Sequence, residues 1–409
     1  MLKDLASYSA LMEKCSHCGF CEATCPVYRA DLLETHVARS RMIIVKETLV
    51  EKNLPFSKRA EEVINRCLLC SNCQQTCPAN VPVDEIVMAA RHQVYKGKRL
   101  NLPKRILLKQ VMEKRGVKGL LKKADIMAKS VGISPKEIPL VPKKSFEDLY
   151  QGTYAPEGEI RDHVAYFVGC ATNTLYPDTG DAVMKVLLVN GIKVTIPEKI
   201  VCCGIPALVE GDIDTARELM EKNIQALAAL DVETIITDCT SCGLTLKQKL
   251  LKVIPEDDPL SEKARAVSSK IMEVTDYLNH TGLTRTPDEI DQLYTYHVPC
   301  HGNWTQTVND APRSLLSEIP GATLKEMEEP EKCCGAGGVF FMDNKELSQK
   351  ILSPKIEDIN QTEADTVVTQ CPSCRSYLNS GLDEVKQVMH PITLLAKAYG
   401  FKGLNEESE

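Results

Sequence analysis

All the cysteines of this chain, 18 in number, fall into four spaced groups with none left over. Two groups share the spacing C-x2-C-x2-C-x3-C-P, and they are Cys15, Cys18, Cys21 and Cys25, then Cys67, Cys70, Cys73 and Cys77. Two share a second pattern, which we call the CCG pattern, and they are Cys170, Cys202, Cys203, Cys239 and Cys242, then Cys300, Cys333, Cys334, Cys371 and Cys374. Because thiolates are soft ligands that favour iron–sulfur clusters, we expect a chain that binds such clusters and moves electrons.

The first spacing is typical of bacterial ferredoxins with two clusters. Three thiolates of each run bind one [4Fe–4S] cubane cluster, and the fourth, before proline, binds the other cluster. We therefore predict that Cys77 joins Cys15, Cys18 and Cys21, and that Cys25 joins Cys67, Cys70 and Cys73. This crossover makes the two halves depend on each other for folding. Zinc could also be bound by such cysteine pairs, but the duplicated motif favours paired cubane clusters.

The CCG pattern has more cysteines than a cubane cluster needs. Either four thiolates bind a cluster and one is spare, or one of two adjacent thiolates bridges irons in an opened, non-cubane cluster. The spacing leaves both alternatives open, and one or two further clusters are expected. We predict Cys242 and Cys374 in the first turn of helices, where the dipole favours thiolate. Glycines follow the paired cysteines and would allow the backbone to approach a cluster; these are Gly204, Gly335, Gly337 and Gly338.

Short apolar runs alternate with amphipathic segments from residue 160 onward, which predicts a largely parallel α/β arrangement. The expected strands are Val164–Val168, Lys193–Ile196, Thr234–Thr237, Tyr294–Val298 and Thr366–Thr369. The expected helices are Asp181–Val189, Asp212–Leu230, Asp310–Ser317 and Lys345–Glu363. The corresponding CCG cysteines lie 130 to 132 positions apart, which indicates a tandem duplication. Open α/β sheets place ligands at the carboxyl ends of their strands, where we expect Cys170, Cys239 and Cys371.

These patterns predict an α+β multi-domain protein. Residues 1–100 are expected to form a mainly helical ferredoxin-type domain with two [4Fe–4S] clusters. Residues 101–158 are expected to form a basic helical linker. Two tandem α/β CCG domains with largely parallel sheets are expected at 159–282 and 283–409.

Charge is distributed unevenly, although the net charge is −7. Residues 91–144 contain 16 Lys and Arg against three acidic residues. The segment is either a solvated helical linker or a docking site for an acidic partner or an anionic membrane surface, and docking of this kind would weaken at high salt. It matches no nucleic-acid recognition motif, so we expect no nucleic-acid partner.

Long apolar stretches are absent from the sequence, so no transmembrane segment is expected. The first residues do not resemble a secretory signal. An unexported chain keeps its thiols reduced and available to metal. We therefore expect a protein of the cytoplasm. It is either free there or attached peripherally to the inner face of the membrane.

The whole cysteine arrangement resembles the iron–sulfur subunit of the glycolate oxidase and D-lactate dehydrogenase group, with relatives in anaerobic glycerol-3-phosphate dehydrogenase. It is also similar to the catalytic subunit of heterodisulfide reductase. The resemblance rests on the two patterns, on Pro299-Cys300-His301 and on Cys334-Gly335-Ala336-Gly337-Gly338. One departure is that glycolate-oxidase-type subunits often lack a cysteine in the second C-x2-C pair, whereas Cys371 and Cys374 are both present here. By analogy with heterodisulfide reductase, the resemblance implies five-thiolate clusters in the CCG domains.

The sequence has no dinucleotide-binding fingerprint and no P-loop, so the primary oxidation of a substrate is expected on another subunit. The resemblance implies a FAD-containing dehydrogenase subunit as partner in a hetero-oligomer. This chain would pass electrons from a 2-hydroxy acid such as lactate or glycolate toward a quinone, an electron-transfer flavoprotein or another carrier. The alternative is a catalytic subunit that cleaves a disulfide at non-cubane clusters.

Some residues beside the cysteines have ordinary structural explanations. His17 and His301 are expected to hydrogen-bond to cluster sulfur or to backbone rather than to bind iron. Trp304 is expected to serve packing. Phe20 and Tyr28 are expected to form an apolar shell that limits solvent around the cubane clusters.

Overall fold

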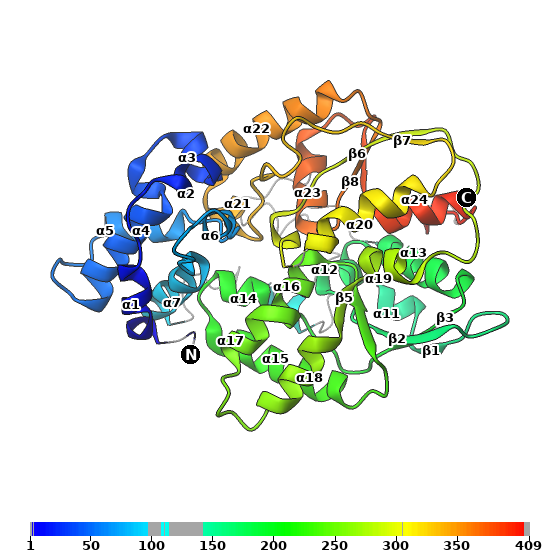
Figure 1. The fold of residues 1–409 in the computed structure, drawn as a ribbon, viewed down its shortest axis with the longest axis horizontal. Coiled ribbons are helices and arrows are strands. Elements are labelled where there is room, and N and C mark those ends of the chain that lie inside the picture. Colours follow the sequence, from blue (N-terminus) through cyan, green and yellow to red (C-terminus); the bar gives the residue numbers. More distant parts are fainter. Residues whose placement is uncertain are drawn as a thin grey trace.

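The fold has three parts that follow one another along the chain: a helical N-terminal domain and two α/β domains (Figure 1). In this computed structural model the described residues are 2, 4–96, 108–109, 111–113, 142–304 and 306–404. Most of the basic segment 91–144, and with it the predicted docking role, lies outside the described residues. No helix among the described residues is long and apolar enough to cross a membrane.

The N-terminal domain consists of short helical segments connected by the cysteine loops. They are η1 (Leu5–Tyr8), α1 (Ser9–Glu13), α2 (Phe20–Thr24), α3 (Pro26–Asp31), η2 (Glu34–His36), α4 (Ala38–Val45), η3 (Lys46–Val50), α5 (Lys58–Asn65), α6 (Asn72–Gln75) and α7 (Val83–Tyr95). The helix α7 begins with acidic side chains, Asp84 and Glu85, which suit a helix N-terminus. It is buried along most of its length and forms the boundary with the rest of the protein.

The first α/β domain contains a sheet in the order β1-β3-β2-β4-β5. Its strands are β1 (Gly152–Tyr154), β2 (Asp162–Tyr166), β3 (Ile192–Ile196), β4 (Thr234–Thr237) and β5 (Ile271–Glu273). Its helical segments are α11 (Phe146–Leu149), α12 (Cys170–Thr174), α13 (Pro177–Val189), α14 (Ile205–Val209), α15 (Ile213–Ala228), α16 (Thr240–Leu244), η4 (Thr245–Lys249), α17 (Leu250–Val253), α18 (Ser261–Lys270) and α19 (Val274–Thr281).

The second α/β domain repeats this design with a sheet in the order β7-β6-β8-β9. Its strands are β6 (Gln292–Tyr296), β7 (Ala322–Leu324), β8 (Thr366–Val368) and β9 (Gln387–Met389). Its helical segments are η5 (Cys300–Gly302), α20 (Gln306–Ser317), α21 (Phe340–Asp343), α22 (Lys345–Gln361), α23 (Pro372–Gly381) and α24 (Pro391–Ala398).

Both sheets are parallel apart from the edge strand β1, which pairs antiparallel with β3. The predicted α+β organisation with largely parallel sheets is therefore confirmed. The strands β2 and β6 begin two residues earlier than predicted, and β1, β5, β7 and β9 were not predicted. Each of these four missed strands has only three residues, too few to show a periodic pattern.

Residues 142–158, which the sequence analysis placed at the end of the linker, pack with the first α/β domain. The strand β1 extends the sheet, and the fully buried Phe146 lies against Gly180 of α13. The aromatic ring takes the space that a side chain at position 180 would need, since a Cβ there would lie 2.4 Å from it. The structural unit therefore begins before residue 159.

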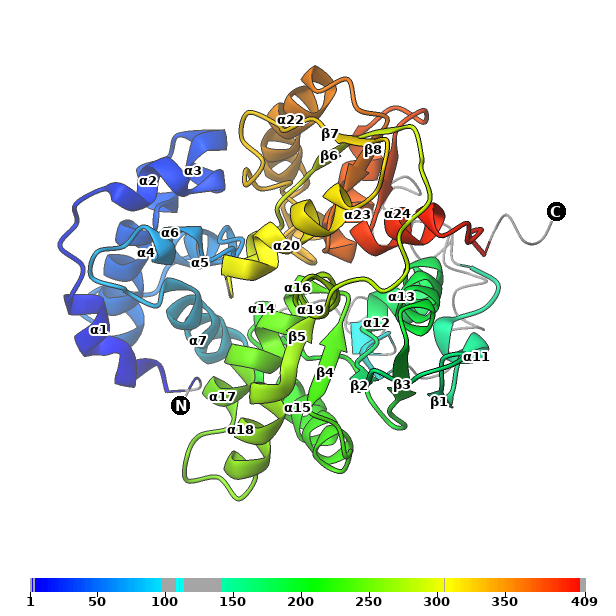
Figure 2. The same cartoon turned by 45° about the vertical axis from the view of Figure 1, so that its right-hand side comes forward.

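The two α/β domains are joined by an apolar core that residues of both form. The helix α24 of the second domain packs on α13 of the first, and α19 of the first packs on α20 of the second. A single apolar cluster accordingly contains residues of both sheets, including Val164, Val194, Tyr294 and Val368. In Figures 1 and 2 the helices α13, α19, α20 and α24 accordingly lie close together where the two α/β domains meet.

The N-terminal domain contacts both α/β domains. Arg91 of α7 donates to the carbonyl of Val209 in the first, and α3 packs against α22 of the second. Arg29 of α3 forms an ion pair with Glu329, with N···O at 2.8 Å. The blue N-terminal helices accordingly lie beside both α14 and α22 in Figure 1.

Candidate metal centres

The two ferredoxin-type loops have the same backbone conformation. His17 and Leu69 occupy equivalent positions with φ of 56° and 57°, and Gly19 and Ser71 are likewise left-handed at 87° and 62°. Each loop then enters a short helix, α2 or α6, and these two helices pack together. The repeated left-handed residues curl each loop, which turns its closely spaced thiols inward.

The cysteines of the two loops mix in space. Cys77 lines the same pocket as Cys15, Cys18 and Cys21, and Cys73 reaches it too. Cys25 instead packs in an apolar cluster with Cys70. Cys77 and Cys25 lie beside the groups to which the crossover assigns them, whereas Cys73 also lines the pocket of the other group, and the ligand sets stay a prediction.

All ten cysteines of the two CCG patterns line one cavity of about 120 Å³. Within the first domain the Sγ atoms of Cys170 and Cys202 lie 3.4 Å apart, and within the second those of Cys334 and Cys374 lie 3.3 Å apart. Such a concentration of soft sulfur donors fits iron–sulfur clusters. Sequence analysis treated the two patterns as separate, whereas the shared core brings them face to face.

The C-x2-C loops of the two domains touch directly. The Thr240 N–H donates to the Gln370 carbonyl at 3.2 Å, and Ser241 Oγ lies 4.0 Å from Cys371 Sγ. As predicted, Cys242 and Cys374 lie in the first turn of a helix, α16 and α23 respectively. The two halves of the cavity are therefore held together by backbone as well as by packing.

The glycines of the Cys-Cys-Gly triplets have a different role from the one expected. Gly204 and Gly335 are left-handed, with φ of 100° and 88°, and a Cβ on Gly335 would lie 2.7 Å from the Ser348 carbonyl of α22. The backbone at Gly204 therefore lies close to Ala216 of α15, and the backbone at Gly335 lies close to α22. Neither glycine lines the cavity. Gly337 and Gly338 do line the cavity, as expected.

In both CCG domains the same cysteine of the adjacent pair has a lowered pKa. Hydrogen bonding with Cys202 and Cys242 lowers the pKa of Cys203 well below its ordinary value, and hydrogen bonding with Cys333 and Cys374 lowers the pKa of Cys334 to about 5. The second cysteine of each adjacent pair is thus the one that most readily becomes a thiolate, which is the form that binds metal.

The second ferredoxin-type group adjoins the second CCG site. Cys70 packs in one apolar cluster with Cys333 and the partly buried Cys300. Leu68, from the same loop as Cys70, lines the cavity of the CCG cysteines. Cys18 of the first ferredoxin-type group is exposed, and the pocket that it lines is also lined by Cys73 of the second group. The cysteine groups therefore form a continuous series from the surface to the shared cavity.

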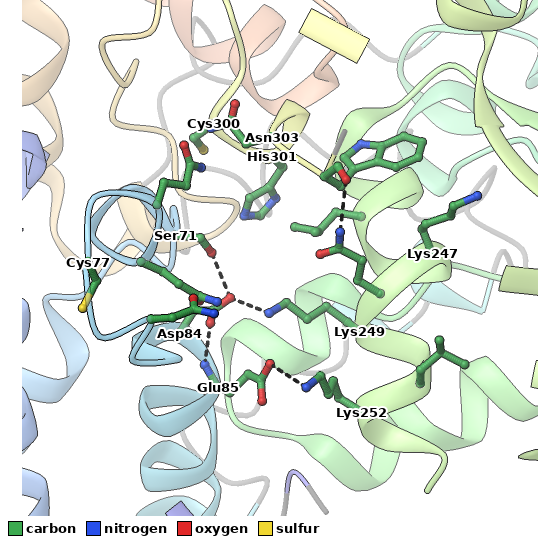
Figure 3. Close-up of a pocket in the computed structure, with 17 residues that line it drawn as sticks. Ser71, Cys77, Asp84, Glu85, Lys247, Lys249, Lys252, Cys300, His301 and Asn303 are labelled. Atoms are coloured by element: carbon green, nitrogen blue, oxygen red, sulfur yellow. Dashed lines mark hydrogen bonds and ion pairs between the residues drawn. The ribbon is translucent and has the colours of Figure 1, made fainter. Parts of the chain in front are cut away.

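An open pocket of about 650 Å³ lies between the N-terminal domain and the α/β domains, and Figure 3 shows its lining. Cys77 of the N-terminal domain, at the left in Figure 3, and Cys300 of the second α/β domain, at the top, both line it. The Lys249 ammonium bonds to the Asp84 carboxylate, which also accepts from Ser71 Oγ at 2.8 Å. Burial raises the pKa of Asp84, but its contacts with Lys249 outweigh this and hold the pKa below its ordinary value. This buried ion pair joins two domains beside the candidate metal centres.

Two further expectations from the sequence are met beside this pocket. The His301 ring bonds to Ser241 Oγ at 2.9 Å and to the Leu69 carbonyl at 3.2 Å, so the ring connects the domains. Trp304 is buried and packs on Gly243, where a Cβ would lie 2.5 Å from the indole.

The expected apolar shell around the cubane clusters is only partly present. Phe20 is 62% exposed, so its ring does not limit the access of solvent. Tyr28 packs against the apolar cluster that contains Cys25 and Cys70, and its hydroxyl donates to Glu34 at 3.3 Å.

His297 is a residue of the second CCG site that the sequence motifs did not predict. Its ring nitrogen, Cys334 Sγ and Cys374 Sγ all lie within 4.8 Å of one another, and all three residues are buried. A comparison of the two repeats could have found it, because Phe167 occupies the equivalent position, three residues before the first cysteine of the pattern.

Comparison with protein families supports the domain assignment. Residues 11–81 match the family described as "4Fe-4S dicluster domain". Residues 164–247 and 294–379 each match the family described as "Cysteine-rich domain". Together the matches include all 18 predicted ligand cysteines.

Two of the similar curated proteins match this chain over nearly the whole length of both sequences, and a third matches about half of this chain. The "Probable glycolate oxidase iron-sulfur subunit" of Bacillus subtilis is 29% identical, over 95% of this chain and 94% of that protein. One subunit of the dihydromethanophenazine:CoB--CoM heterodisulfide reductase of Methanosarcina acetivorans is 25% identical, over 95% of this chain and 94% of that protein. "Lactate utilization protein A" of Bacillus cytotoxicus is 30% identical, over 56% of this chain and 95% of that protein.

One solved structure has a similar fold. The crystal structure of a hypothetical protein from Helicobacter pylori superposes with a TM-score of 0.55 and 10% sequence identity. The match covers 90% of this chain and 68% of that one. At this identity the likeness supports the fold alone.

Proposed function

Because the chain belongs to the family of iron–sulfur proteins in which a 4Fe-4S dicluster domain precedes two cysteine-rich CCG domains, we propose that it is the electron-transfer subunit of a flavin-linked 2-hydroxy acid dehydrogenase complex. The observation that carries the proposal is the continuous series of cysteine groups, from the exposed Cys18 to the cavity shared by the CCG cysteines. The names of the glycolate oxidase and lactate utilization relatives support lactate or glycolate as the substrate class.

We assign two [4Fe–4S] clusters to the N-terminal domain with the crossed ligand sets, and one iron–sulfur cluster to each CCG domain. Bound at these sites, the clusters would supply one-electron transfer. The protein keeps the sites close together: Cys70 packs with Cys333, and the loops around Cys239 and Cys371 touch through Thr240 and Gln370. Tight packing around these thiols also excludes water, which tunes reduction potentials.

The proposed partner is a FAD-containing protein that oxidises the hydroxy acid and delivers its two electrons. The exposed Cys18 and the 62% exposed Phe20 next to it offer a place where such a partner could approach a cluster. The final acceptor in this proposal is a quinone or another carrier, and the setting is cytoplasmic or peripheral at the membrane.

Anaerobic purification of the tagged chain from its own cells tests this function. We expect a flavoprotein to copurify, and lactate or glycolate to bleach the visible iron–sulfur absorption of the complex within seconds but not that of the isolated chain. Failure of both the copurification and the bleaching would reject the hydroxy acid proposal. Dithionite provides the control, since it should reduce the clusters in either preparation.

A second candidate function is the reductive cleavage of a disulfide at the CCG sites. It is favoured by the intact Cys371 and Cys374, by Cys300, which lies between the shared cavity and the open pocket, and by the similarity to the heterodisulfide reductase of Methanosarcina acetivorans. The reaction would consume two electrons and two protons and release two thiols. With reduced viologen and a mixed disulfide, this function predicts two thiols for each disulfide cleaved. The electron-transfer function alone predicts no thiol release.

A further inference from the structure

The two CCG domains carry different residues at the position that directly follows the strands β2 and β6. Phe167 and His297 each follow a central strand and each stand three residues before the first cysteine of the pattern. Their backbone N–H groups donate to the neighbouring strand in the same way, Phe167 to Ile236 at 2.9 Å and His297 to Val368 at 3.0 Å. Their relative exposures are 0% and 1%, so one fold position carries an apolar ring in one domain and an imidazole in the other.

The imidazole of His297 has polar atoms that the protein leaves unsatisfied. Neither ring nitrogen has a hydrogen-bond partner among the described residues, although both nitrogens are buried. Buried polar groups are nearly always paired, so an unpaired imidazole implies a partner other than the protein. Its nearest candidate ligand atoms are Cys334 Sγ and Cys374 Sγ, both within 4.8 Å.

We propose that His297 donates a ring N–H hydrogen bond to a sulfur atom of the iron–sulfur group in the second CCG domain, and that this bond gives the two CCG centres different reduction potentials. A hydrogen bond is favoured over iron ligation because five cysteines already surround the site. In the first domain the Phe167 ring offers no donor at the equivalent place.

The direction of the difference follows from electrostatics. Reduction adds negative charge to the cluster and its sulfurs, and a donor that points at sulfur stabilises this charge. The second CCG centre is therefore the one with the higher potential, and it is also the centre that adjoins Cys70 of the N-terminal domain. The inference rests on the proposed cluster sites but not on any substrate.

Exchanging the two residues tests the inference in the full-length chain. His297→Phe introduces the residue that the sister domain already accommodates, and Phe167→His is its reciprocal. We expect redox titrations with dithionite and mediator dyes, monitored by EPR, to show a lower midpoint potential of the second CCG centre in His297→Phe. In Phe167→His the midpoint potential of the first CCG centre should be higher. Iron content should stay that of the unmodified chain. His297→Gln, which keeps an N–H donor, should restore part of the shift.

Several outcomes would overturn the inference. They are unchanged midpoints in His297→Phe with iron retained, loss of the second centre in that variant, or pulsed-EPR couplings typical of iron-bound nitrogen in the unmodified chain. Zinc at the second site would also reject it, together with the proposed cluster. Failure of lactate or glycolate to reduce the protein would leave these titrations unaffected, so the two failures are distinguishable.

Discussion

Replacing Cys77 by alanine should make Cys15, Cys18 and Cys21 reactive toward alkylating reagents while Cys67, Cys70 and Cys73 stay protected. The reason is the crossover: Cys77 lies in the pocket of the first group although its sequence neighbours belong to the second. A [4Fe–4S] cluster needs four thiolates, so we expect the whole cluster to be lost from the variant, with about four fewer irons per chain. Mass spectrometry of peptides after a brief alkylation identifies which cysteines have reacted.

Cys25→Ala is the matched control for this experiment. Cys25 packs with Cys70, so its removal should reverse the pattern and expose Cys67, Cys70 and Cys73. If each substitution exposed the cysteines of its own run instead, the clusters would be uncrossed. Equal exposure of both groups would mean that the domain unfolds as a whole, which circular dichroism would show.

Replacing Lys249 by methionine should cost about 3–5 kcal/mol of stability, because it leaves the Asp84 carboxylate charged and buried without its partner. The two side chains are 8% and 3% exposed, and they join the N-terminal domain to the first CCG domain. Since the pKa of Asp84 lies below its ordinary value, the carboxylate is ionised at neutral pH. The midpoint of anaerobic thermal unfolding measures the effect.

Lys252→Met is the control for Lys249→Met. Lys252 lies on the following helix, its side chain is 55% exposed, and its ammonium is 3.5 Å from a Glu85 oxygen. Exposed ion pairs contribute less than about 1 kcal/mol, so the midpoint should change little. Adding Asp84→Asn to Lys249→Met should recover much of the lost stability. Equal destabilisation by the two lysine substitutions would contradict the role of the buried pair.

Much of the fold and of the candidate sites was predictable because cysteine spacing constrains local geometry. The apolar runs before Cys170, Cys239 and Cys371 predicted strands followed by ligands, and β2, β4 and β8 do lead into these cysteines. The positions of Cys242 and Cys374 in first helical turns followed from the same local reasoning.

Other features depend on contacts between distant residues. The three-residue strands β5, β7 and β9 form because neighbouring strands supply their hydrogen bonds, not because their own sequences demand extended backbone. The exposure of Phe20 likewise follows from which faces the domains cover.

The sequence by itself determined that the chain has two kinds of cysteine site, that the CCG unit is duplicated and that iron–sulfur chemistry is its purpose, because ligand type and spacing are local properties. Only the tertiary structure decided that all ten CCG cysteines share one cavity, that Cys70 adjoins the second site and that His297 faces it unpaired. The shared cavity arises from the packing of α13 on α24 and of α19 on α20, and the place of Cys70 from the packing of the N-terminal domain, through α3, against α22. His297 meets Cys334 and Cys374 because the fold of its own domain brings these distant positions together. No local pattern encodes how such distant positions meet.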